Sequence, residues 1–85
     1  MNTTAEDGLA TVAERVRYAR ELAGLSQRQL SVAAGLSHST VNCVEAGTAD
    51  TRLGTVEAIA RALGVSRDWL LTGLGDPPTR KEAAP

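Results

Sequence analysis

The sequence predicts an all-α domain of five short helices. Apolar residues recur every three or four positions, the spacing that places them on one face of a helix. Glycines separate these segments, and no stretch shows the apolar–polar alternation typical of a half-buried strand. The chain has 85 residues, of which 42% are hydrophobic, so it is long enough for one core and apolar enough to fold.

The first helix is expected over residues 10–23. Gly24 is expected to end it, because glycine freely adopts the left-handed backbone that closes many helices. The apolar stripe of this helix consists of Leu9, Val12, Ala13, Val16, Ala19 and Ala23. Three arginines of the predicted helices are expected on solvated faces: Arg15, Arg17 and Arg61.

Two shorter helices are expected over residues 27–34 and 38–46. Ser26 and Ser37 precede them and are the expected N-caps, because a serine hydroxyl can accept from an unpaired amide of the first turn. The residues predicted to face inward are Leu30, Val41 and Val44, with either Ala33 or Ala34. The opposite face of the later helix carries His38, Ser39, Asn42 and Cys43.

The last two helices are expected over residues 53–63 and 67–72, with Ser66 capping the second. Their predicted core residues are Leu53, Val56, Ile59, Ala60, Leu63, Trp69 and Leu70. Residues 1–8 are polar and acidic and predict a flexible arm, while the proline-rich, polar residues 75–85 predict a disordered tail. The folded domain is therefore expected over residues 9–74.

Composition excludes several classes of function. Nine basic residues against ten acidic ones give a net charge of −1, so bulk positive charge is not available to hold nucleic acid, although a local basic patch is. One histidine and one cysteine, His38 and Cys43, are five positions apart and predict no metal site and no cofactor. No helix face carries paired carboxylates and no glycine-rich phosphate loop of a known spacing is present, so an enzyme is not expected. An acidic start without a long apolar run predicts a cytoplasmic protein that is not held in a membrane.

Residues 27–44 contain the most informative pattern. Two short helices meet around Gly35-Leu36, a spacing typical of a helix-turn-helix, and Ser31 is expected where they approach most closely. A helix in the major groove reads bases through donors and acceptors near its start, and helix N-termini present free amides to phosphate. The side chains offered in the two first turns are Ser26, Gln27 and Arg28, then Ser37, His38, Ser39 and Thr40.

Two runs, ERVRYARELAGLSQRQLSVAAGLSHSTVNCVEAGT and TVEAIARALGVSRDWLLTG, carry a resemblance that extends over residues 14–73. They resemble the lambdoid phage repressor and Cro-type helix-turn-helix family, also called the Xre family. The resemblance implies a compact five-helix, lambda-repressor-like DNA-binding domain whose second and third helices form the helix-turn-helix. It further implies a sequence-specific regulator, acting as a repressor, that binds a palindromic operator in double-stranded DNA as a homodimer.

The resemblance also implies roles for individual residues. Gln27 matches a glutamine that bonds a DNA phosphate and braces the first recognition residue, which here is His38. Arg20 and Glu45 match a pair that forms a buried ion pair between the first and third helices. The implied base contacts come from His38, Ser39, Asn42 and Cys43, and the phosphate contacts from Ser26, Gln27, Arg28, Ser37, Thr40 and Arg52. The implied dimer interface contains Arg67, Leu71 and Leu74.

Some residues depart from the family pattern. Ser31 stands where the family usually has alanine, and its hydroxyl is expected to fit and to bond back to its own helix. Ala46 replaces a residue that is usually polar or basic, and the following loop contains Asp50. The main cations left on the DNA-facing side are Arg17, Arg28 and Arg52, which predicts few phosphate contacts and a shallow salt dependence.

Alternatives stay open at three points. His38 is either a DNA contact or simply an exposed residue at a helix start. Cys43 is a reader of a thymine methyl group, an inert surface residue or a redox-sensitive thiol. The alternative function is a protein-interaction module, such as an antitoxin or an anti-repressor, that keeps the fold with weak DNA binding and has a protein partner.

Overall fold

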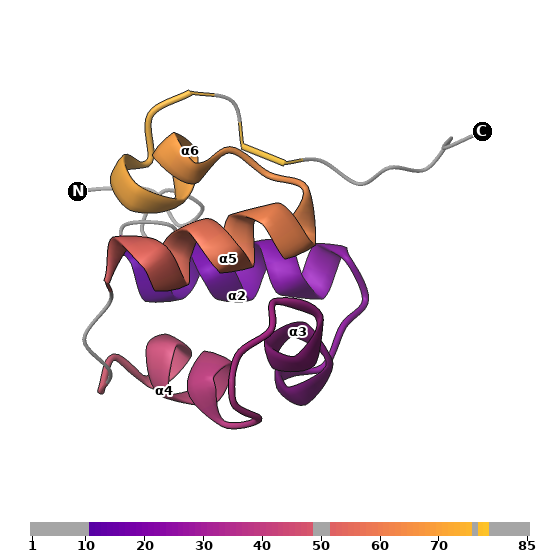
Figure 1. Cartoon of the computed structure of the whole chain (residues 1–85). Coiled ribbons are helices and arrows are strands. Elements are labelled where there is room, and N and C mark those ends of the chain that lie inside the picture. Colours follow the sequence, from indigo (N-terminus) through magenta and orange to yellow (C-terminus); the bar gives the residue numbers. More distant parts are fainter. Residues whose placement is uncertain (1–10, 49–51, 76, 79–85) are drawn as a thin grey trace.

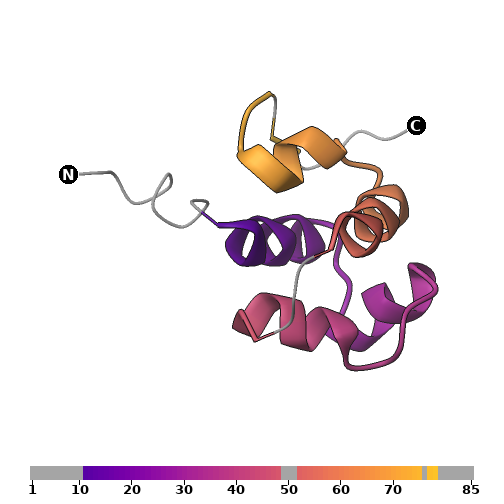
Figure 2. The same cartoon turned by 60° about the vertical axis from the view of Figure 1, so that its left-hand side comes forward.

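The computed structural model describes residues 11–48, 52–75, 77 and 78, and this part of the chain contains helices and no strand. The helices are α2 (Val12–Leu22), α3 (Gln27–Ala33), α4 (Thr40–Ala46), α5 (Leu53–Leu63) and α6 (Arg67–Thr72). α2 and α5 form a middle tier, with α3 and α4 on one side of it and α6 on the other (Figures 1 and 2). The predicted all-α class is confirmed.

Serine and threonine caps begin three of the helices. Thr11 precedes α2 and forms a capping box with Glu14, each side chain lying 3.1 Å from the other residue's backbone nitrogen. Ser26 forms the same arrangement with Gln29 at the start of α3, and the Ser66 hydroxyl accepts from Trp69 N at the start of α6. The predicted caps Ser26 and Ser66 are therefore confirmed, and each satisfies an amide that has no partner within its own helix.

The start of α4 differs from the prediction. The helix begins at Thr40 rather than 38, and its N-cap is Ser39, whose side chain makes no capping hydrogen bond. Ser37 was the expected cap, but its hydroxyl lies 2.9 Å from that of Thr40. The physical reason is the backbone of Ser39, which at φ −101° and ψ 2° lacks the extended conformation that a capping side chain normally needs.

Ser31 supplies the missing cap from the neighbouring helix. Its hydroxyl is completely buried and accepts from Val41 N at 3.0 Å, in the first turn of α4. The expected bond from Ser31 back to its own helix is thus wrong. Ser31 of α3 thus stabilises the start of α4, because the buried Val41 amide would cost free energy if it had no acceptor.

The core lies where the three tiers meet. Its buried residues are Val16, Ala19, Leu30, Val41, Val44, Val56, Ile59, Ala60, Trp69 and Leu70. Some predicted members are different: Ala34 is half-buried whereas Ala33 and Ala23 are exposed, and Leu53, at the start of α5, is 53% exposed. These residues stand at or next to the ends of α2, α3 and α5.

Arg15 was expected in solvent and is instead 5% exposed. Its Nε donates to Leu70 O at 2.9 Å, and its Nη2 donates to Leu71 O at 3.1 Å. These carbonyls belong to the last turn of α6, where backbone acceptors lack partners and a positive charge is favourable. Burial lowers the pKa of the Arg15 guanidinium. The sequence does contain a signal for this position, since Arg15 lies four residues before the buried Ala19 and so on the same helix face.

Part of the predicted organisation falls outside the described residues. This applies to the arm of residues 1–8, to Leu9, to Asp50 and to most of the tail after Gly75. Among the helices that the structure describes, none has the length and apolarity needed to cross a bilayer.

Replacing Ser31 by alanine tests the cap that α3 provides to α4. We expect Ser31→Ala to lower the free energy of unfolding by about 1–2 kcal/mol, because Val41 N loses its buried acceptor. Urea unfolding followed by circular dichroism measures this. Ser39→Ala is the matched control and should change the free energy by less than about 0.5 kcal/mol, since that side chain caps nothing. Equal effects of the two substitutions would contradict this interpretation.

The two bonds from Arg15 to α6 lead to a second prediction. Arg15→Met keeps much of the side-chain volume and removes both donors, and we expect a loss of about 2–3 kcal/mol in the free energy of unfolding. The control is Arg17→Met, which removes an exposed pair with Glu21 and should cost about 0.5 kcal/mol or less. An Arg15→Met protein as stable as the control would show that α6 does not depend on these bonds.

Candidate nucleic-acid interface

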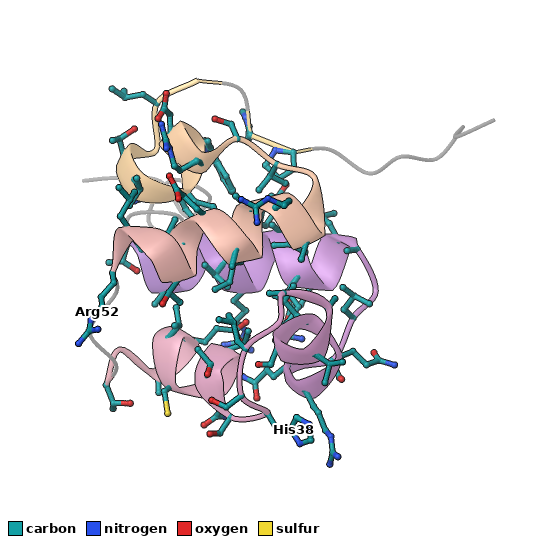
Figure 3. All side chains as sticks on the ribbon, in the orientation of Figure 1. His38 and Arg52 are labelled. Carbon is teal, nitrogen blue, oxygen red and sulfur yellow. The ribbon has the colours of Figure 1, made fainter. Side chains whose placement is uncertain are left out.

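The outward side of the α3–α4 unit presents short polar side chains. His38 and Ser39 are exposed in the turn before α4, and Asn42 is exposed one turn into the helix. Val41 and Val44 are buried on the opposite side. Figure 3 shows His38 at the turn between α3 and α4 and Arg52 beyond the other end of α4, both pointing away from the domain.

The remaining predicted residues of α4 are less available. Cys43 is a half-buried free cysteine, and its backbone oxygen accepts from the Thr48 hydroxyl at 3.3 Å. Thr40 is half-buried, and its hydroxyl is hydrogen-bonded to the hydroxyl of exposed Ser37. The open contacts thus concentrate at His38, Ser39 and Asn42.

The start of α3 lies beside this face. Ser26 and Arg28 are exposed and Gln27 is half-buried, and Arg28 has no hydrogen bond or ion pair with any residue that the structure describes. Arg17 is less free, because its Nε donates to Glu21 Oε2 at 3.2 Å. A hollow here joins α2, α3 and α4 and is lined by Arg17, Arg20, Ser26, Gln27, Asn42, Glu45 and Ala46.

The two residues expected to pair, Arg20 and Glu45, are in contact at the base of the hollow. Arg20 Nε donates to Glu45 Oε2 at 2.6 Å and Nη2 to Oε1 at 3.0 Å. The remaining nitrogen, Nη1, donates to Leu25 O at 2.8 Å. The side chains are 12% and 5% exposed, respectively. The hydrogen bond to Glu45 raises the pKa of Arg20, so this guanidinium stays charged at any pH at which the domain works.

Gln27 connects this ion pair to the surface. Its Nε2 donates to Glu45 Oε1 at 3.0 Å, and its Oε1 accepts from Asn42 Nδ2 at 2.9 Å. Gln27 therefore braces Asn42, and the expectation that it braces His38 is wrong. The reason is the late start of α4, which leaves His38 in the preceding turn. Sequence reasoning missed the contact between Gln27 and Asn42, because only the crossing of the two helices brings positions fifteen apart together.

The predicted dimer residues lie on the opposite tier. Arg67 forms an ion pair with Glu57, Leu71 is half-buried against the core, and Leu74, just beyond α6, is 72% exposed. Within the described residues, no three His, Cys, Asp or Glu side chains cluster as a metal site would require.

Two short helices meeting at a glycine turn, with the start of the second one open to solvent, define the helix-turn-helix class of protein. A sequence model described as helix-turn-helix matches residues 16–70. The chain belongs to this family and is of its Xre/Cro-like type.

Relatives with curated names support this membership. Over 68 residues the chain is 41% identical to the HTH-type transcriptional regulator PrtR of Pseudomonas aeruginosa, covering 80% of this chain and 26% of PrtR. It is 33% identical over 78 residues to the HTH-type transcriptional regulator DicA of Escherichia coli, covering 87% of this chain and 58% of DicA. The chain therefore spans about a quarter of PrtR and somewhat more than half of DicA.

Two solved structures share the fold. The hypothetical transcription factor NHTF from Neisseria has a TM-score of 0.71 and 30% identity, over 99% of this chain and 92% of that chain. The restriction-modification controller protein C.AhdI from Aeromonas hydrophila has a TM-score of 0.69 and 33% identity, over 74% and 96% of the two chains.

Removing the charge of Glu45 tests the ion pair. We expect Glu45→Gln to cost about 3 kcal/mol of unfolding free energy, because it leaves the buried Arg20 guanidinium with only the exposed Glu21 carboxylate, 4.0 Å away, as a counter-ion. Thermal and urea unfolding measure the loss. Glu21→Gln is the control, and this exposed carboxylate should change stability by about 0.5 kcal/mol or less. If the two variants are equally stable, the ion pair does not hold α4 against α2.

Proposed function

We propose that this chain is a DNA-binding domain of a transcriptional regulator that binds a palindromic operator as a homodimer and represses by occupying it. The observation that carries the proposal is the open start of α4, where His38, Ser39 and Asn42 are exposed above the buried valines. Side chains of this kind supply the donors and acceptors that base edges in the major groove require. The regulator would act in the cytoplasm on double-stranded DNA and catalyse no reaction.

The surroundings of α4 suit phosphates. Ser26, Gln27 and Arg28 begin α3 on one side of the face, and Arg52 lies past the far end of α4 (Figure 3). With α4 in the major groove, these side chains would meet the backbone on either side, together with Ser37 and Thr40 from the intervening turn. Cys43, being half-buried, would offer only an edge of its side chain to a base.

The small size of the reading surface supports the proposed homodimer. One helix-turn-helix reads a few base pairs, and dimers of this class read two half-sites about one helical turn apart. Leu74 is the most exposed of the large apolar side chains among the described residues, and with Leu71 and Arg67 it would form the contact between protomers. The names of PrtR and DicA as transcriptional regulators support a regulatory role.

The second candidate is a protein-interaction module such as an antitoxin or an anti-repressor. Two observations favour it: the net charge is −1, and Arg17 is held by Glu21 rather than free for phosphate. Such a module would use the α4 face or α6 to contact a protein, with weak DNA binding. Binding assays with DNA separate the two candidates.

Selection of bound sequences from random duplex DNA, followed by mobility-shift assays, tests the proposal. We expect a palindromic consensus, and we expect the double variant His38→Ala, Asn42→Ala to bind it at least about tenfold more weakly, because each lost base contact is worth about 1–3 kcal/mol. Arg61→Ala, exposed on α5, is the control and should bind as the wild type does. Absence of a consensus, or binding that ignores the double substitution, would favour the protein-interaction module.

The salt dependence of that binding gives a further prediction. Arg28 and Arg52 are the cations beside the face, and Arg17 joins them if it leaves Glu21. Three phosphate contacts predict a slope of log K against log salt concentration no steeper than about −3 per protomer. Titrations between about 50 and 200 mM salt measure it. A slope near −10 for the dimer, as highly basic repressors show, would mean that other cations contact the DNA.

A further inference from the structure

We infer that Asn42 determines sequence specificity by accepting a hydrogen bond from the exocyclic amino group of an adenine or a cytosine, and that the chain Arg20–Glu45–Gln27 sets the orientation of its amide. The inference rests on the proposed DNA binding and deepens it by naming the base chemistry at one position. It uses four side chains from α2, α3 and α4 that are joined by measured hydrogen bonds.

Glu45 determines which groups donate and which accept in this series of hydrogen bonds. Its carboxylate accepts from two nitrogens of Arg20, and a carboxylate can only accept. Gln27 therefore has to present its NH₂ group to Glu45, as it does at 3.0 Å. A flipped Gln27 would place its carbonyl oxygen against the carboxylate, and the Glu45 side chain, at 5% exposure, has little contact with water that could relieve the repulsion.

The orientation of the Gln27 amide in turn determines the orientation of the Asn42 amide. With its NH₂ group committed to Glu45, Gln27 offers only its oxygen on the other side, so Asn42 has to donate to it through Nδ2. An amide that turned over would set two oxygens against each other. The charge of a buried pair thus selects one of the two amide orientations of an exposed side chain on α4.

What remains of the Asn42 amide is the acceptor Oδ1 and one N–H of Nδ2. Oδ1 has no hydrogen-bond partner among the described residues, and the side chain is exposed. In the major groove adenine offers N6–H and cytosine N4–H, whereas guanine O6 and thymine O4 are acceptors that would face Oδ1 unfavourably. The second Nδ2–H is not used by Gln27 and could in addition donate to adenine N7.

His38 and Ser39 have no comparable constraint. Neither side chain is hydrogen-bonded to a residue that the structure describes, so each can rotate to suit either a donor or an acceptor on a base. Among these three side chains, Asn42 is therefore the one whose acceptor is oriented toward the amino groups of bases before DNA arrives.

The experiment measures binding of the full chain to its selected operator and to a panel in which each base pair is changed to the other three. We expect one position per half-site to prefer adenine or cytosine by about 5- to 100-fold over guanine and thymine. Asn42→Ala should reduce that preference to about twofold or less and leave other positions unchanged. The panel itself shows which of the two bases is chosen, and 7-deazaadenine, which lacks the N7 acceptor, shows whether the second N–H takes part.

Gln27→Met tests the relay, and Gln27→Ala repeats the test with a smaller side chain. Both should relax specificity at the position that Asn42 reads, with urea unfolding confirming that each variant is folded. Arg28→Met is the matched control: it removes a phosphate contact, so affinity should fall for all sequences alike while the preference stays.

Three outcomes would overturn the inference while DNA binding stands. They are an operator with no position sensitive to Asn42→Ala, a preference for guanine or thymine at the sensitive position, and a uniform loss of affinity in Gln27→Met with the preference intact. Failure to select any DNA sequence would overturn the proposed function, and this inference with it.

Discussion

The ion pair between Arg20 and Glu45 is the contact on which the geometry of the α4 face depends. It is bidentate, buried, and joined to the backbone at Leu25, so it ties α2, α4 and the α2–α3 turn at one point. Buried ion pairs add little net stability compared with apolar packing, but their hydrogen bonds are satisfied in only one arrangement of the two side chains. Here that arrangement sets the distance between α2 and α4, the orientation of the Gln27 amide and, through it, that of the Asn42 amide.

The other end of α2 has an arginine contact of a different kind. Arg15 donates to two carbonyls of the last turn of α6, and a Cβ at Gly73 would lie 3.0 Å from its Nη1. Gly73 also has φ +79°, a backbone conformation that residues with a Cβ rarely adopt. Glycine at this position therefore permits the turn after α6 and leaves room for the Arg15 guanidinium. A core of valine, leucine, alanine and one isoleucine with one tryptophan is small. These directed bonds therefore specify how α2 is placed against its neighbours, where apolar packing alone would allow several arrangements.

Local rules account for most of the fold. The bounds of α5 and α6, the caps Ser26 and Ser66, and the buried stripe through Val56 and Ile59 follow from residue spacing and cap chemistry within a few positions. The start of α4, the contacts that Arg15 makes on its buried helix face and the partner of Gln27 do not follow. Each depends on a group from another helix: Ser31 for the first, the end of α6 for the second, Asn42 for the third.

The late start of α4 matters for how the proposed interface would work. Because the helix begins at Thr40, His38 and Ser39 belong to the turn, and Asn42 is the exposed residue that both lies within the helix and is held by a neighbour. Side chains of a turn can rotate to suit what they contact. A side chain that is held in one orientation on a helix cannot, so binding to a base with the wrong hydrogen-bonding groups loses free energy. Ser31 also affects this interface from the buried side of α4. Its bond to Val41 N fixes where the helix starts, and hence where Asn42 lies relative to Gln27. Specificity in this small domain would then come from the buried polar contacts that orient its surface as much as from the surface residues themselves.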